Sequence, residues 1–157
     1  MKNYELQNSL IKKYIESLQA LKEHGILNNK KDFTSQIGEW LVCELFDGEM
    51  APSSIQKDWD MIIGDKKVQV KAHSKATTNP NRKTYLDYEL GCDIDELIIV
   101  VFNETYSLQE LYRVPWEVVC QAKEFNKKRR EIYWSTLNEF KLDLVSIENQ
   151  SVLELFT

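Results

Sequence analysis

The apolar run from Leu97 to Phe102 limits the possible folds of this chain more than any other segment does. Its residues are Leu-Ile-Ile-Val-Val-Phe, and Asp95 and Glu96 precede them. A strand with one face in water alternates apolar and polar residues, whereas a strand buried on both faces is apolar almost throughout. The run therefore predicts a central strand that is covered on both sides of its sheet.

Three helices are predicted from apolar residues at helical spacing. They span residues 3–27, 34–46 and 116–125. Either Asp32 or Thr34 is suited to cap the start of the second helix. The first helix is expected to pack as a core or dimer element, because its apolar stripe is long and its remaining residues suggest no chemistry.

Further strands are predicted on both sides of the apolar run. Residues 108–114 are expected to pair with it, residues 85–90 alternate and suggest a short strand, and the tail 131–157 is mixed in character. No internal repeat or linker divides the 157 residues. We therefore expect one domain over residues 1–157, an α/β fold in which helices flank a central mixed β-sheet.

A β-hairpin is predicted between Asp58 and Lys75. Its first arm is Met-Ile-Ile, a Gly-Asp-Lys turn follows, and the second arm alternates between apolar and polar residues. Asp60 opens the first arm, while Gln69 and Lys71 share the polar face of the second, roughly 7 Å apart. An acid, an amide oxygen and an ammonium in this arrangement suit one divalent metal ion and one activated water.

Charge is distributed unevenly along the chain. The net charge of −5 does not suggest nucleic-acid binding, but residues 66–83 contain six basic residues and no acid. Such a strip can steer a polyanion to one surface. The basic run 127–130 is more simply explained as a solvated loop.

Several other classes of protein are disfavoured. No apolar run is long enough to cross a bilayer and no signal peptide is evident, so a cytoplasmic location without membrane contact is expected. The three cysteines, Cys43, Cys92 and Cys120, are far apart and suggest neither a disulfide framework nor a zinc site. Two histidines argue against a multi-histidine metal centre.

Taken in order, these residues resemble the PD-(D/E)XK nuclease superfamily, the restriction-endonuclease-like fold. The resemblance covers residues 34–125. It rests on Gly38-Glu39 in a helix, Asp60 at the start of a hairpin, Gln69-Val70-Lys71 in its second strand, and the buried strand that follows. The chain departs from the family pattern because no proline precedes Asp60 and because Gln69 replaces an acid. A Q-x-K variant occurs in parts of the superfamily.

The resemblance implies a set of roles for these residues. Asp60, Glu39, the Gln69 side-chain oxygen and the Val70 carbonyl would hold Mg²⁺ or Mn²⁺, and Lys71 would be the catalytic lysine. Glu44, on the same helix as Glu39, is an alternative ligand. The residues implied to contact nucleic acid are His73, Lys75, Arg82 and Lys83, although His73 also fits a surface histidine.

Two hypotheses follow for the function. The first is a metal-dependent endonuclease that hydrolyses phosphodiester bonds in DNA in a restriction or defence setting. It would act as a homodimer, since each site cuts one strand, with the first helix or the tail 131–157 as the dimer surface. The second is a nuclease-like fold that binds nucleic acid or protein without cutting, with Gln69 marking a degraded site. Whether the substrate is DNA or RNA stays open at this point.

Overall fold

The protein is described by a computed structural model over residues 4–29, 31–52, 58–76, 81–86, 92–121, 125–126 and 129–157. A five-stranded mixed sheet lies at its centre, with the strand order β1-β2-β3-β5-β6. β3 and β5 are parallel, and the other neighbouring pairs are antiparallel. The strands are β1 (Glu49–Met50), β2 (Met61–Ile63), β3 (Lys66–His73), β5 (Glu96–Phe102) and β6 (Leu108–Pro115).

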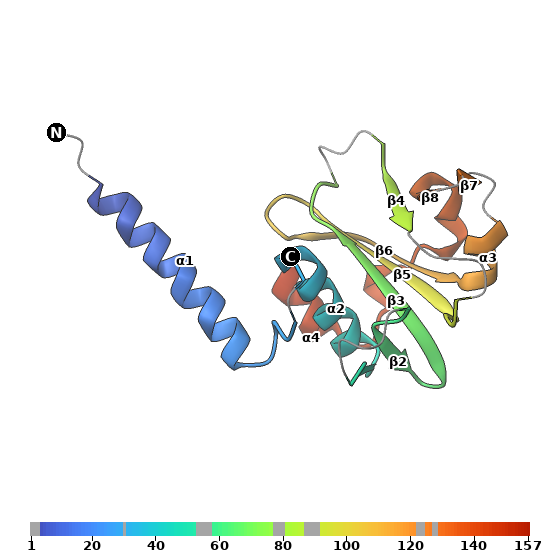
Figure 1. Ribbon diagram of the computed structural model, residues 1–157, viewed down its shortest axis with the longest axis horizontal. Helices are drawn as coiled ribbons and strands as arrows, with labels where there is room; N and C mark the ends of the chain where they lie inside the picture. Colours follow the sequence, from blue (N-terminus) through green and yellow to red (C-terminus); the bar gives the residue numbers. More distant parts are fainter. Residues whose placement is uncertain are drawn as a thin grey trace.

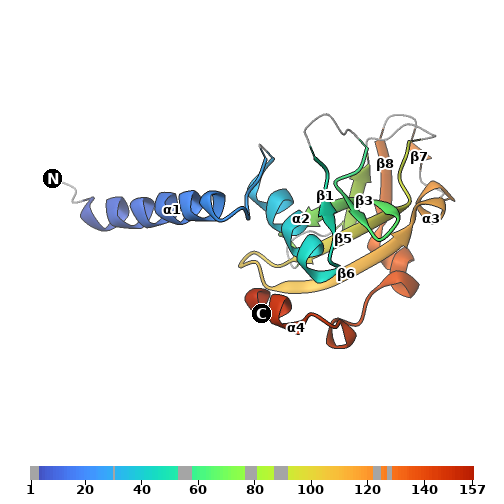
Figure 2. The ribbon, with the colours of Figure 1, turned by 90° about the horizontal axis from the view of Figure 1, so that it is seen from below.

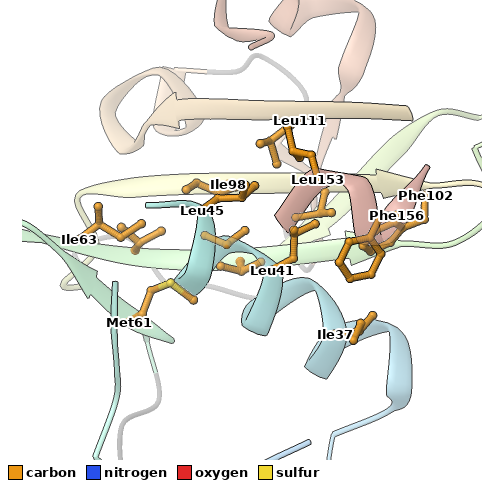
Figure 3. Close-up of a cluster of buried hydrophobic side chains, with 14 residues drawn as sticks. Ile37, Leu41, Leu45, Met61, Ile63, Ile98, Phe102, Leu111, Leu153 and Phe156 are labelled. Carbon is orange, nitrogen blue, oxygen red and sulfur yellow. The ribbon is translucent and has the colours of Figure 1, made fainter. Parts of the chain in front are cut away.

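The predicted central strand is confirmed as β5, because every one of its residues is buried. Its side chains alternate between two apolar layers. Ile98, Val100 and Phe102 face α2 (Phe33–Leu45) and the C-terminal segment, where Leu153 and Phe156 complete the layer (Figure 3). The neighbouring residues of β5 face a second layer on the opposite side of the sheet. The expected α/β fold with a helix-flanked mixed sheet is therefore confirmed.

The second layer is closed by a small sheet with the order β4-β8-β7. Its strands are β4 (Lys83–Leu86), β8 (Arg129–Tyr133) and β7 (Phe125–Asn126), and α3 (Trp116–Gln121) lies beside them (Figure 1). The predicted helix 116–125 was too long, because Phe125 pairs with Arg130 in a hairpin instead. Likewise, the short strand predicted over 85–90 begins at Lys83, and residues 87–90 lie outside the described residues.

The C-terminal tail wraps back over the molecule in short helical turns. They are η1 (Trp134–Phe140), η2 (Leu144–Ser146), α4 (Gln150–Leu153) and η3 (Glu154–Phe156). Phe156 packs at 5.4 Å from the Phe102 ring, so the chain end completes the core that α2 covers. The tail is thereby part of the domain and covers the apolar layer on the α2 side.

The first helix, α1 (Glu5–Glu23), projects away from the rest of the molecule (Figures 1 and 2). None of its residues is buried, and five large side chains of its apolar stripe are 55% to 68% exposed: Leu6, Leu10, Ile11, Tyr14 and Ile15. The expectation that this helix packs into the core is wrong for the single chain. Among the described helices, none combines the length and apolar character that a membrane span requires.

Candidate metal and nuclease site

The predicted hairpin is confirmed as β2 and β3, which pair from Met61–Val68 to Ile63–Lys66. Gly64 adopts a positive φ of 64° in the turn, a conformation that glycine tolerates without strain. β2 is shorter than β3, so the edge of β3 beyond Val68 is not paired with it. Asp60 lies where β2 begins, and its N–H donates to the Val68 carbonyl at 2.9 Å.

The Asp60 carboxylate hydrogen-bonds to this unpaired edge of β3. Its Oδ2 accepts a hydrogen bond from the Val70 N–H at 2.8 Å, and the side chain of Asp60 is buried. On the same strand, the Gln69 amide nitrogen donates to the Val70 carbonyl at 3.3 Å. The backbone of Val70 is therefore the point at which the Asp60 carboxylate and the Gln69 amide meet.

Glu39 reaches this edge from α2. Asp32 caps the helix by accepting from the Ser35 N–H at 3.1 Å, which selects it over Thr34 as the N-cap. Gly38 allows α2 to approach β3 closely, because a Cβ at this position would lie 2.4 Å from the Cβ of Ala72. The helix therefore brings Glu39, which is only 3% exposed, against the edge of the strand.

A lysine that the motif did not include joins the two carboxylates. The Lys31 Nζ lies 2.5 Å from Glu39 Oε1 and 2.6 Å from Asp60 Oδ1. The other oxygen of Glu39 accepts from the Asn29 amide at 3.2 Å. Two buried acids from different elements thus converge on one cationic atom.

The negative charges of the two carboxylates in this cluster outnumber the single positive charge of Lys31. Burial, and then the charge of Asp60, raise the pKa of Glu39, and Lys31 opposes this only in part. Burial alone would lower the pKa of Lys31, but its bonds to Asp60 and Glu39 outweigh that effect and raise it. Because two carboxylates share one ammonium, the fully ionised cluster carries one excess negative charge.

Gln69, Lys71 and His73 leave β3 on the face opposite α2. Ala72, which alternates with them, packs toward Gly38 of α2. The His73 Nε2 lies 2.9 Å from the Thr84 hydroxyl, and the His73 ring lies 5.1 Å from the Trp134 ring. Burial, followed by the nearby charge of Lys71, lowers the pKa of His73 to about 4. His73 is therefore half-buried between Thr84 of β4 and Trp134, and it is not the fully solvated side chain that the interpretation as a surface histidine implies.

The structure therefore divides the predicted catalytic residues into two groups. Glu39, Asp60 and the Val70 backbone come together, with the Gln69 amide beside them. Lys71 leaves the strand on the face opposite α2, as Gln69 does, but it lies near His73 and apart from the two carboxylates. The alternative ligand Glu44 is exposed, and its backbone carbonyl accepts from the Asn149 side chain instead.

Most basic residues of the 66–83 strip have acidic partners. Arg82 donates to both carboxylate oxygens of Glu110 at 2.7 Å, and Lys83 lies 2.8 Å from Glu131. Lys75, by contrast, is exposed directly after β3. Lys66 and Lys67 pair with Glu96 and Asp93, so the strip is less positive on the surface than the sequence suggests.

Sequence reasoning missed Lys31 and the residues that hold it. A lysine in a polar loop looks solvated, and nothing local distinguishes it. The signal lies in α2, where Gln36 and Glu39 are polar but share the buried side of an apolar helix. Buried polar groups need partners, and the loop that precedes the helix is the nearest source of them.

Among the described residues, no group of three or more His, Cys, Asp and Glu side chains is placed to hold a metal ion. Any metal site here rests on two carboxylates supplemented by amide and carbonyl oxygens. Comparison with known proteins adds no assignment, since no family model matches the chain and no curated protein matches it.

Proposed function

We propose that this chain is a metal-dependent endonuclease of the PD-(D/E)XK type that hydrolyses phosphodiester bonds in DNA. The observation that supports it is the convergence of Glu39 and Asp60 on one cation position, at 2.5 and 2.6 Å from Lys31 Nζ. Buried carboxylates are rare unless they are paired or hold metals. Their placement on a helix and on a hairpin edge agrees with the roles that the resemblance implies.

The residues at this edge fit Mg²⁺ or Mn²⁺. Magnesium uses oxygen ligands and needs one or two carboxylates, with water and substrate phosphate completing its shell. Glu39 and Asp60 would supply the carboxylates, and the Val70 carbonyl and the Gln69 amide oxygen would supply neutral ligands. When bound, the ion would polarise the scissile phosphate and lower the pKa of a coordinated water.

The remaining chemistry belongs to the side chains of the chain itself. Lys71 leaves β3 on the face opposite α2, so it would have to reach across the edge of the strand to donate hydrogen bonds to the attacking water. There it would stabilise the charge that develops on the phosphate oxygens. Lys75 is the phosphate contact that we favour, because it is exposed beyond the end of the same strand. Arg82 and Lys83 would also contact phosphate if they exchange their carboxylate partners for it.

A homodimer is part of this proposal, with α1 as its interface. Each apolar side chain of α1 would contribute about 1.5–3 kcal/mol when buried in a dimer, and six or more are available. Together they can exceed the cost of association, which is about 4–15 kcal/mol. The polar residues of α1 include three lysines and three glutamates. This balance disfavours a membrane surface, whose helices are rich in basic residues, and favours a second copy of the same helix. We place the protein in the cytoplasm.

A second function is favoured by one observation. Lys31 already neutralises part of the carboxylate charge, and Gln69 stands where a third acid is expected. A fold of this kind that binds nucleic acid or protein without cutting would need no metal, and a permanent Lys31 bridge would suit it.

A cleavage assay separates these functions. Purified protein is incubated with supercoiled and linear DNA, and with RNA, in the presence of Mg²⁺, Mn²⁺ or a chelator. We expect metal-dependent cleavage of DNA that Asp60→Asn and Lys71→Ala abolish and that Glu44→Gln leaves intact. Cleavage that persists in Asp60→Asn would contradict the proposed site, and absence of cleavage with every substrate and metal would favour the binding module.

A further inference from the structure

The cation position between Glu39 and Asp60 is filled by a side chain that reaches in from solvent. The two acids are buried, with side chains 4% and 8% exposed, whereas the Lys31 side chain is 45% exposed. The acids are therefore fixed by their helix and strand edge. The ammonium is the component that has an open path out of the cluster.

The backbone of Lys31 is held independently of its ammonium. The buried Gln36 amide donates to the Lys31 carbonyl at 2.7 Å and accepts from the Asn29 N–H at 3.0 Å. The Lys31 N–H in turn donates to the Asn29 side-chain oxygen at 2.8 Å. Because these bonds do not involve the ammonium, its side chain can rotate outward while the loop stays in place.

A comparison within the same chain shows that the cluster is short of positive charge. Glu96 is also buried, and it has two cations, with Lys66 and Arg113 both at 2.8 Å. At the Glu39 and Asp60 cluster the ratio is reversed, with two acids and one cation. A divalent ion would balance the two carboxylates, whereas Lys31 leaves one negative charge uncompensated.

We propose that Lys31 is a resident counter-ion of this site and exchanges with the divalent metal ion. The ammonium bonds the same two carboxylate oxygens that a metal ion needs, so the two cations cannot be held there together. In the absence of metal, Lys31 keeps the buried acids gathered and partly neutralised. Metal binding then requires the Lys31 side chain to swing into solvent. This inference rests on the proposed metal site and adds to it an internal competitor.

The exchange has a measurable consequence for metal affinity. The apparent dissociation constant is raised by the reciprocal of the fraction of molecules in which the position is open. A lysine that fills the position in nine molecules out of ten would weaken binding about tenfold. Replacing the ammonium with an uncharged side chain should remove that penalty.

The test is calorimetric titration of Mn²⁺ into the full chain and into Lys31→Met. We expect Lys31→Met to bind Mn²⁺ about tenfold more tightly, or better, and Asp60→Asn in either background to abolish binding. Lys66→Met is the matched control, since Lys66 also pairs with a buried glutamate and is 50% exposed. It should bind Mn²⁺ as the unmodified chain does.

A second measurement uses the unmodified chain, in case Lys31→Met does not fold. Lysines are labelled with an amine-reactive reagent with and without saturating Mn²⁺, and the labelled sites are quantified by mass spectrometry. We expect Mn²⁺ to increase the labelling of Lys31 several-fold and to leave that of Lys66 unchanged.

The outcomes separate this inference from the proposed function. Equal Mn²⁺ affinity in Lys31→Met and the unmodified chain, together with unchanged Lys31 labelling, would overturn the exchange and leave the Asp60-dependent metal site intact. Weaker binding in Lys31→Met would also overturn it, because Lys31 would then support the site. Absence of Mn²⁺ binding in both proteins would overturn the metal site and the exchange together.

Discussion

Glu39 and Glu44 lie on the same helix, yet they have opposite surroundings. Glu39 is 3% exposed and bonded to Lys31, whereas Glu44 is exposed. We predict that Glu39→Gln lowers metal-dependent DNA cleavage by more than the about 10–100-fold that is typical of outer-shell partners. Rates would be measured with Mn²⁺ at saturating and limiting concentrations. The matched change Glu44→Gln should leave the rate unaltered, and an equal loss in both variants would contradict the assignment.

His73 makes the stability of the fold depend on pH. Burial, with Lys71 as the second cause, lowers the pKa of His73 from 6.5 to about 4. Between these values the unfolded chain binds a proton that the folded chain does not. The contribution of neutral His73 is therefore complete above pH 6.5 and is lost as the pH falls toward 4. The stability lost by pH 5 through this titration is about 2 kcal/mol.

Urea unfolding at pH 7 and pH 5 measures this effect. We expect the unmodified chain to lose about 2 kcal/mol more between these pH values than His73→Gln does, because glutamine cannot titrate. The difference between the two proteins removes the contribution of the carboxylates. Identical losses would show that His73 is already as accessible to protons in the folded chain as in the unfolded one.

At the scale of residues, the sequence was informative wherever chemistry follows a local pattern. Asp60 and Glu39 could be selected from the order of the motif, and the structure places both at the edge of β3. Lys31 could not, because its two partners lie 8 and 29 residues away, on a helix and at the start of a strand, and no motif relates them to it. A long-range contact of a loop lysine leaves no periodic trace in the sequence.

At the scale of elements, the packing of α2 on β3 sets the position of the site. A Cβ on Gly38 would lie 2.4 Å from the Cβ of Ala72, so one of the two elements would have to move. Overpacking of this kind costs about 1–3 kcal/mol. We predict that Gly38→Ala destabilises the protein by this amount and weakens Mn²⁺ binding, because Glu39 follows Gly38 directly.

A double-mutant cycle in urea unfolding checks the cause. Ala72→Gly removes the clashing atom. The double variant with Gly38→Ala and Ala72→Gly should therefore lose less free energy of unfolding than the two single variants lose in total, by more than about 0.5 kcal/mol. Additive effects of the two substitutions would mean that Gly38→Ala acts through helix propensity or some other local effect.

The elements that the sequence predicted well are those with strong local periodicity. The hairpin and the buried strand β5 are of this kind. The small sheet was not predicted, because β4 pairs with β8, so that Thr84 faces Ile132 across a large separation in the chain. The helix predicted to reach Phe125 was too long for a different reason, since Phe125 forms a local hairpin with Arg130, only five residues further on.

At the scale of the whole molecule, α1 is the element through which the proposed homodimer would form. None of the residues of α1 is buried in the single chain, and a helix that gains little from tertiary packing is only marginally stable in water, so its apolar stripe favours a partner. We predict that the purified chain sediments as a dimer and that Ile11→Glu, which places a charge in the exposed stripe, shifts it to the monomer. Ser9→Glu adds the same charge to the polar face and should stay dimeric. A monomeric unmodified chain at all concentrations would contradict this interface.

In the proposed metal site, Glu39 and Asp60 would hold a catalytic ion in the place that Lys31 fills without it. The most direct test is a crystal structure of the protein soaked in Mn²⁺, with the ion located from its anomalous scattering. We predict one strong peak about 2.1 Å from an oxygen of each carboxylate, with the Lys31 side chain turned toward solvent. An undisturbed Lys31 bridge, with no peak beside Glu39 and Asp60 at saturating Mn²⁺, would contradict it.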